Sequence, residues 1–140
     1  MTVTQQDPLV GTWILNPSRS EFDPNHRPQA ATLVIARDDD GRYLVTAEGV
    51  SEKGQKVTER PQTLIPDGQP RPVPEFPGLM ATCGRPEPRT VQTDVRREDG
   101  SLAGQATFIV SPDGRSLTAI NSGFDSQLRQ FKQTTSWDKR

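Results

Sequence analysis

Five dipeptides in which glycine follows Asp or Lys divide this chain into short segments. They are Asp40-Gly41, Lys53-Gly54, Asp67-Gly68, Asp99-Gly100 and Asp113-Gly114. Glycine adopts a positive φ without steric cost and Asp tolerates one, so such pairs are typical of the tight turns between antiparallel strands. No segment of a dozen residues shows helical periodicity, and the chain is therefore predicted to be all-β.

The segments between the turns are rich in strand-forming residues. We expect strands near residues 10–16, 31–37, 42–49, 55–64, 79–83, 90–97, 102–110, 115–121 and 128–137. Consecutive strands joined by tight turns form an antiparallel meander, and a sheet of about eight or nine strands must split or close to hide its edges. The simplest outcome is an antiparallel up-and-down β-barrel.

Alternation along two of these segments is typical of half-buried strands. Ala106 and Phe108 share one strand face, and so do Tyr43 and Val45. Several strands carry apolar residues on both faces, so the pattern leaves open which face points inward.

Length and composition limit the size of the core. The 140 residues indicate one domain, which we assign to 9–140 with an N-terminal tail over 1–8. Apolar residues make up 31% and aromatic residues 6% of the chain, so any cavity should be partly polar. The net charge of -1 comes from interspersed charges, which argues against a nucleic-acid partner.

The sequence contains no motif for a metal or a cofactor. Cys83 is the only cysteine, no Cys/His cluster accompanies it, and the turn Asp38-Asp39-Asp40-Gly41 lacks the ligand spacing of a calcium loop. We therefore expect no cofactor. The first residues show no basic segment followed by an apolar run, so we expect no membrane partner and a cytoplasmic protein, or a secreted one if a leader has been trimmed. A homo-oligomer is compatible with the sequence.

Two long connections interrupt the regular spacing. The first covers residues 17–30, and the second, 61–89, holds eight of the thirteen prolines. Proline removes ladder donors and favours an extended polyproline conformation, so residues 66–78 are predicted to form a stiff loop. Long ordered loops on small domains are often functional, and we expect these two to shape the mouth of the barrel.

The first predicted strand contains Leu9-Val10-Gly11-Thr12-Trp13, which resembles the Gly-x-Trp signature of the lipocalins and their calycin relatives. With the hairpin around Asp113-Gly114 and the closing Trp137-Asp138-Lys139, the chain is similar to small bacterial lipocalin-like proteins, mostly of unassigned function, from about Leu9 to Lys139. The resemblance implies a barrel in which Gly11 and Trp13 have a structural role, with Trp13 closing one end. It also implies a small-ligand cavity without naming the ligand.

Aromatic side chains are the best candidates for a binding pocket. We single out Phe22, His26, Tyr43, Phe76, Phe108, Phe124 and Arg129 for ligand contact. Phe22 and Phe76 come from the two long connections, so they reach the same mouth only if both connections lie at one end. Arg129 would suit an anionic head group if it pointed inward, although unpaired charges are rarely buried, which favours an outward position.

Three hypotheses for function follow. The first is binding of a small apolar or amphipathic molecule in the barrel. The second is a small barrel enzyme, an isomerase or cyclase acting on a hydrophobic substrate with Tyr43 or His26 as a polar group, although no catalytic constellation is present to assign. The third is a protein-interaction module that uses the proline-rich loop. A cavity with a convergent polar pair would favour the enzyme, and a solid core would count against ligand binding.

Overall fold

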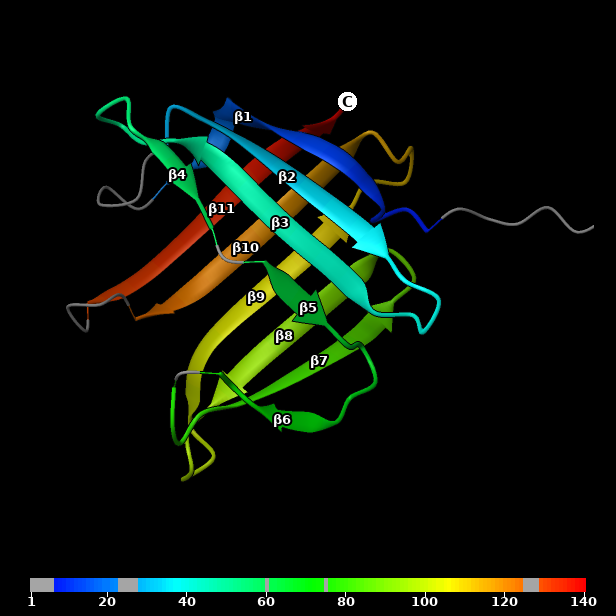
Figure 1. The fold of residues 1–140 in the computed structure, drawn as a ribbon, viewed down its shortest axis with the longest axis vertical. Coiled ribbons are helices and arrows are strands. Elements are labelled where there is room, and N and C mark those ends of the chain that lie inside the picture. The colour runs from blue at the N-terminus through cyan, green and yellow to red at the C-terminus, as the bar shows by residue number, and fades with distance from the viewer. Residues whose placement is uncertain (1–6, 23–27, 60, 75, 125–128) are drawn as a thin grey trace, which may run out of the picture.

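A computed structural model describes residues 7–22, 28–59, 61–74, 76–124 and 129–140 (Figure 1). This part of the chain forms one antiparallel sheet of eleven strands and contains no helix, and thus no helix long and apolar enough to cross a membrane. The strands are β1 (Gly11–Glu21), β2 (Ala30–Arg37), β3 (Tyr43–Val50), β4 (Lys56–Thr58), β5 (Gln62–Leu64), β6 (Pro70–Pro72), β7 (Met80–Glu87), β8 (Thr90–Arg96), β9 (Leu102–Val110), β10 (Ser116–Phe124) and β11 (Gln130–Lys139). The predicted all-β antiparallel class is confirmed.

The sheet is a meander whose first and last long strands pair. The strand order is β4-β3-β2-β1-β11-β10-β9-β8-β7-β6, and β5 also pairs with β3. Figure 1 shows β2 and β3 running across the direction of β9 to β11, as expected for a sheet folded over itself. No ladder of the described residues joins β6 to β4 or β5, so the barrel is open along this seam.

The strand count exceeds the expected eight or nine because of short edge strands. The predicted strand 55–64 is split into β4 and β5, and β6 lies inside the predicted loop 66–78. Pro70 and Pro72 are tolerated in β6 because this strand pairs only with β7 and leaves its other side unpaired in the described chain.

β1 also continues past Pro17, where the first connection was expected to begin. The register between β1 and β11 shifts between Asn16 and Glu21, which marks a β-bulge. Within it the Ser20 hydroxyl donates to the Asn16 carbonyl oxygen (2.7 Å) and accepts from the Ser136 N–H (2.8 Å). The Ser20 side chain thus replaces part of the backbone hydrogen bonding that Pro17 interrupts.

Burial decides the inner face that alternation left open. Tyr43 and Val45 are buried, whereas their neighbour Leu44 is 43% exposed. The buried hydrophobic residues are Leu9, Trp13, Leu15, Leu33, Ile35, Tyr43, Val45, Cys83, Val91, Val110, Leu117, Ala119 and Trp137. Many lie near the start of β1, the β2–β3 turn and the β9–β10 turn, which we call the closed end. The opposite end, where β1 ends and β2 begins, is the mouth.

Candidate functional site

Trp13 fills the closed end. Its side chain is fully buried, and its indole N–H donates to the Leu9 carbonyl oxygen at 3.1 Å. The Lys139 ammonium lies 5.6 Å from the centre of the Trp13 rings, within cation–π range. Gly11 has a φ of +151°, and a Cβ there would lie 3.1 Å from Lys139 Cε. The absence of a side chain at Gly11 therefore makes room for Lys139.

Asp7 ties the two sides of the open seam together at this end. Its side chain is only 5% exposed, and it accepts hydrogen bonds from the Leu9 N–H (3.0 Å) and from the Tyr43 hydroxyl. The Arg37 guanidinium approaches it at 2.9 Å and that of Arg85 at 3.1 Å. Arg37 and Tyr43 belong to β2 and β3, and Arg85 belongs to β7, so Asp7 connects strands that no ladder joins directly.

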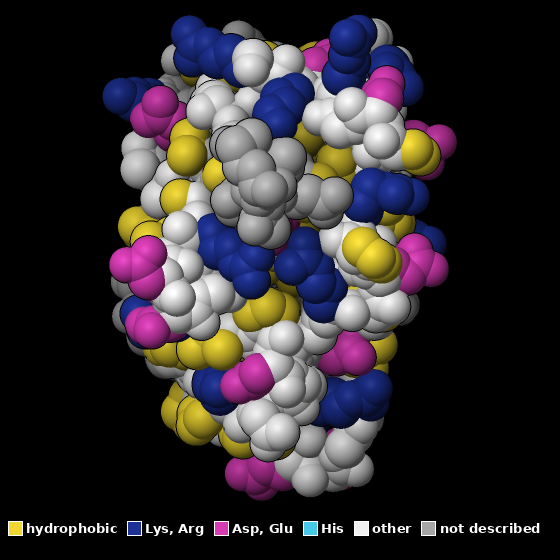
Figure 2. Space-filling model, turned by 90° about the vertical axis from the view of Figure 1, so that its right-hand side faces the viewer, with side chains coloured by type: hydrophobic (Ala, Val, Ile, Leu, Met, Phe, Trp, Pro, Cys, Tyr) yellow, Lys and Arg dark blue, Asp and Glu magenta, His cyan; other side chains and the backbone are white. Residues whose placement is uncertain are grey.

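These contacts determine the ionisation of the cluster. Burial opposes the charge on Asp7, but the hydrogen bonds from Tyr43 and Leu9 and the charge of Arg85 outweigh it and hold the pKa of this carboxyl below its ordinary value. Burial, together with the hydrogen bond to Asp7, raises the pKa of Tyr43 to about 12. Figure 2 views the right-hand side of Figure 1 and shows several Lys and Arg side chains gathered near the middle of this face.

A cavity of about 820 Å³ lies inside the curved sheet. Its lining includes residues at the mouth and residues deeper in the barrel. One wall comes from β2, β3 and β5, and its least exposed side chains are apolar, with Leu33, Val45 and Leu64 among them. Phe22 and Pro28 line the cavity at the mouth. Its volume lies within the range of small-molecule sites.

The opposite wall carries a row of mixed polarity across four strands. Gln133 of β11 is in register with Asn121 of β10, Asn121 with Ala106 of β9, and Ala106 with Thr93 of β8. All four residues line the cavity. Gln133 Oε1 is fully buried and is the only such side-chain polar atom without a hydrogen-bond partner in the described part of the protein.

The polar groups next to this row are paired with each other. The Thr135 hydroxyl accepts from the Trp137 indole N–H at 2.9 Å and donates to the Ala119 carbonyl oxygen at 3.4 Å. Charged residues in the described lining are Glu48, Glu52, Lys53 and Glu59, all of them exposed and on β3 or the segments on either side of β4. The described interior of the cavity is therefore uncharged.

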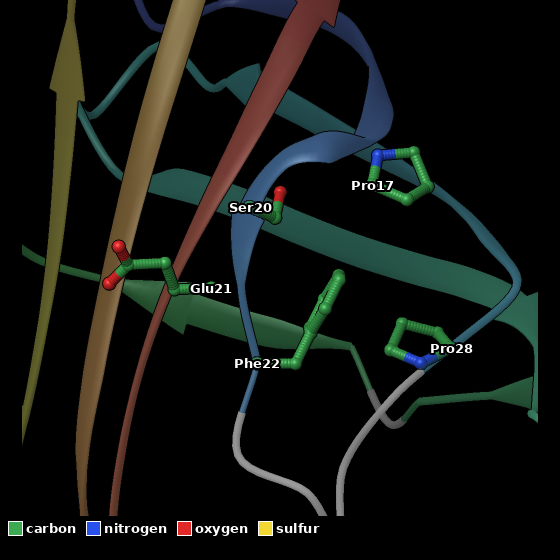
Figure 3. Close-up of a pocket in the computed structure, with 5 residues that line it drawn as sticks. All are labelled: Pro17, Ser20, Glu21, Phe22 and Pro28. Carbon is green, nitrogen blue, oxygen red and sulfur yellow. The ribbon is translucent and has the colours of Figure 1, made fainter.

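A second pocket of about 520 Å³ lies beside the mouth. Pro17, Ser20, Glu21, Phe22 and Pro28 line it (Figure 3). Figure 3 shows the Phe22 ring extending toward the segment that carries Pro28, whereas Glu21 points away on the other side of β1. Phe22 and Pro28 line both pockets.

The structure brings some of the predicted site residues together. Phe22 and Phe108 line the large cavity. Tyr43 instead lies at the closed end with its hydroxyl on Asp7. Phe76 and Phe124 are 58% and 45% exposed, and neither is among the lining residues.

Two further predicted residues lie away from the described cavity. Arg129 is exposed, directly precedes β11 and is not among the lining residues, and His26 falls outside the described residues. The parts of the two long connections that carry Phe22 and Phe76 lie at one end, because the end of β1 and the β6–β7 turn are both at the mouth, whereas the second connection also reaches the closed end at Arg85.

Sequence reasoning missed Asp7, Asn121 and Gln133. A signal existed for the two amides, since Leu117, Ala119 and Asn121 alternate along β10, as do Gln133, Thr135 and Trp137 along β11. The period of two places each amide on the same face as buried apolar residues. Asp7 gave no local signal, because its charged partners are far away in the sequence.

The described residues show no metal centre and no activated nucleophile. No group of three or more His, Cys, Asp or Glu side chains in the described ranges is placed to hold a metal ion. Cys83 is buried, and burial raises the pKa of its thiol in spite of a hydrogen bond with Thr93. A thiol of this kind is a weak nucleophile.

Comparisons with known proteins support the fold. No protein-family model matches the chain, and no curated protein matches its sequence. Among solved structures, the wild-type fluorescent protein UnaG is similar over 94% of this chain and 96% of its own, with a TM-score of 0.61 and 13% identity. Two UnaG mutants match over 95% of this chain and 96% of theirs, with TM-scores of 0.61 and 0.60 and identities of 12% and 13%.

At this level of identity the likeness shows the fold alone. It agrees with the calycin-type architecture that the Gly11 to Trp13 motif implied, whereas the narrower assignment to a bacterial lipocalin-like family stays a prediction. The chain thus folds as an antiparallel, lipocalin-like β-sheet that curls round a cavity and is open along one seam.

Proposed function

We propose that this protein binds a small apolar or amphipathic molecule in the 820 Å³ cavity. The observation that carries the proposal is the cavity itself, which has a mainly apolar wall on one side and a partly polar wall on the other and is open at the mouth. A core filled by side chains would have left no such space, and the low apolar content of the chain is consistent with an unfilled interior.

Apolar contact supplies the affinity in this proposal. Burying about 200 Å² of apolar ligand surface contributes roughly 5 kcal/mol, at about 25 cal/mol per Å². A gain of this size corresponds to a dissociation constant of roughly 0.2 mM, and association costs consume part of it, so we expect dissociation constants of about submillimolar order or weaker for simple ligands.

A fluorescent probe tests the proposal directly. N-phenyl-1-naphthylamine is neutral, apolar and brighter in apolar surroundings, and its emission should rise on titration with the protein. Ala106→Trp adds a large side chain to the cavity wall and should weaken binding at least about tenfold. Ala36→Trp on β2 is the matched control, because Ala36 is exposed and lies outside the cavity lining.

The result would contradict the proposal if the probe failed to bind, or if both tryptophan variants bound it as well as the wild type. The polar pair in the described lining, Asn121 and Gln133, consists of two amides, which do not act as general acids or bases, so it does not favour the isomerase or cyclase hypothesis. Tyr43 is buried at the closed end with its hydroxyl on Asp7, and His26 lies outside the described residues.

A further inference from the structure

Asn121 presents to the cavity an amide that has no partner in the described part of the protein. No described residue hydrogen-bonds to its side chain, and neither of the two polar atoms of that side chain is fully buried. Asn121 lies on the inward face of β10, two positions after the buried Ala119, and lines the cavity. It therefore differs from Gln133, whose Oε1 is sealed within the protein. A molecule in the cavity can reach both the donor and the acceptor of Asn121.

The neighbouring side chains leave this amide uncovered. Ala106 is the register partner of Asn121 on β9, and its side chain ends at Cβ. Cross-strand partners have Cβ atoms about 5 Å apart, so a side chain this short leaves room beside the amide. The hydroxyls of Thr93 and Thr135 on the same wall are already engaged in hydrogen bonds within the protein. Among these three residues, Asn121 is thus the one that offers a ligand an unpaired polar group.

The chemistry of the amide determines which polar group matches it. The carbonyl oxygen of Asn121 accepts and its NH₂ group donates, side by side in one plane. An apolar ligand that covered them would take both from solvent without supplying a partner for either, which costs free energy. A carboxamide carries the same two functions side by side and can satisfy both with two hydrogen bonds. A single hydroxyl oxygen can satisfy only one of them with good geometry.

The charges of the lining disfavour a carboxylate at this position. No described lining residue on β8, β9, β10 or β11 is charged. Around the rest of the described lining, the three carboxylates of Glu48, Glu52 and Glu59 outnumber the single ammonium of Lys53. A carboxylate beside Asn121 would therefore lose hydration without gaining an ion pair, and it would bring a second acceptor against the carbonyl oxygen of the amide.

The rest of the cavity suits hydrocarbon. Leu33, Val45 and Leu64 on the facing wall offer only aliphatic side chains. Phe108 lies two positions after Ala106 on the same face of β9 and also lines the cavity. A ligand that places its polar group against β10 can therefore lay its apolar part against Phe108 and the facing wall.

Resting on the proposed function, we infer that the ligand is a neutral molecule with a carboxamide-type group, which forms two hydrogen bonds with the side chain of Asn121. The N–H of the ligand donates to the carbonyl oxygen of Asn121, and the carbonyl oxygen of the ligand accepts from its NH₂ group. Asn121 is then the residue that selects the polar group, and the apolar wall holds the hydrocarbon without selecting it.

The test uses three ligands with the same eight-carbon acyl chain. Octanamide has the acceptor and the donor, N,N-dimethyloctanamide has the same carbonyl acceptor but no N–H, and octanoate is an anion at neutral pH. Each is titrated against N-phenyl-1-naphthylamine bound to the protein, and inhibition constants are corrected for the affinity of each variant for the probe. In the wild type we expect octanamide to bind at least about threefold more tightly than octanoate.

Asn121→Leu replaces the amide by an aliphatic side chain of similar size. Octanamide loses two hydrogen bonds in this variant and should bind about tenfold more weakly, whereas N,N-dimethyloctanamide loses one and should bind about threefold more weakly. The ratio of the two affinities should thus fall about threefold. Asn121→Ala removes the same polar atoms and tests the same point if the leucine variant folds poorly. Gln130→Leu is the matched control, because Gln130 is an exposed amide outside the lining, and it should keep the wild-type ratio.

The outcomes separate the two proposals. If the probe binds, the inference is overturned by an unchanged ratio in Asn121→Leu and Asn121→Ala, by octanoate binding as tightly as octanamide, or by failure of octanamide to displace the probe. Each of these results leaves the proposed function in place. Failure of the probe and of all three octanoyl compounds to bind would overturn the proposed function itself.

Discussion

The Tyr43 hydroxyl donates a hydrogen bond to the Asp7 carboxylate across 36 positions of sequence. The bond anchors the segment before β1 to the start of β3, and Arg85 attaches the same carboxylate to β7. A sheet that no ladder closes is thereby held together at one end by side chains, while its mouth stays open to the cavity. The barrel is therefore held closed at one end by side chains, and the cavity is reached from the other end.

Replacing Asp7 with Asn should destabilise the fold. The variant removes the charge that faces Arg37 and Arg85 and leaves both guanidinium groups without their shared carboxylate. Because the side chain of Asp7 is 5% exposed, we expect the free energy of unfolding to fall by about 2 to 4 kcal/mol in urea titrations. Asp39→Asn alters an exposed turn residue and should change it by less than about 0.5 kcal/mol. Equal stability of the two variants would contradict the role given to Asp7.

The same cluster predicts a dependence of stability on acid. The pKa of Asp7 is lower in the folded protein than its ordinary value, so its contribution is present above the unfolded-state pKa of about 4 and is lost as pH falls through the folded-state pKa. The stability difference between wild type and Asp7→Asn should therefore shrink as pH is lowered below about 4. A constant difference over that range would show that the charge of Asp7 does not stabilise the fold.

Tyr43 can be observed alone because it is the only tyrosine. Its pKa is raised from 10.0 to about 12, so its contribution to stability is complete below pH 10 and is lost as pH rises toward 12. Tyrosinate absorbance of the native protein should titrate accordingly, and that of the urea-unfolded protein near 10. In Asp7→Asn the native value should fall but stay above 10, since burial persists. A native titration near 10 would mean that the hydroxyl is exposed and not bound to Asp7.

Gln133→Leu should stabilise the protein. The substitution replaces a buried acceptor without a partner in the described protein by an aliphatic side chain of similar size. We expect the free energy of unfolding without ligand to rise by about 1 kcal/mol, measured in urea. Gln130→Leu changes an exposed position and should be neutral. A loss of stability at position 133 would indicate that the amide is already satisfied within the protein.

Cys83 should react slowly with thiol reagents. It is the only cysteine, its side chain is 7% exposed, and burial raises the pKa of its thiol. Labelling in the native state should therefore be at least about tenfold slower than in urea-unfolded protein at the same pH. Equal rates would place the thiol at the surface.

Much of the fold could be predicted because its signals are local. A glycine after Asp favours a tight turn wherever it occurs, so pairs such as Asp99-Gly100 and Asp113-Gly114 located hairpins without any knowledge of the sheet. The error at Pro70 and Pro72, by contrast, has a cause that is not local. Proline excludes a central strand but not an edge strand, and which strands are edges is a property of the assembled sheet.

The site was less predictable because it depends on which side chains share an enclosed space. Phe108 and Tyr43 were both predicted to contact a ligand because both are aromatic. Phe108 does line the cavity, whereas Tyr43 is bound to Asp7 at the closed end. Both belong to inward faces, and they differ only in how far along the barrel they lie. Sequence alternation reports the face of a strand and not the depth within a barrel.

Local chain chemistry thus determined the all-β class and the positions of turns, and the resemblance of the Gly11 to Trp13 motif implied that Trp13 closes one end of the barrel. Only the tertiary structure decided that Asp7 meets Arg37, Tyr43 and Arg85, which lie 30, 36 and 78 positions away, and that Gln133 Oε1 is buried without a hydrogen-bond partner in the described protein. The physical reason is that backbone preferences act between neighbours in sequence. Charge pairing, desolvation and enclosed volume act between neighbours in space, and these exist only once the sheet has curled.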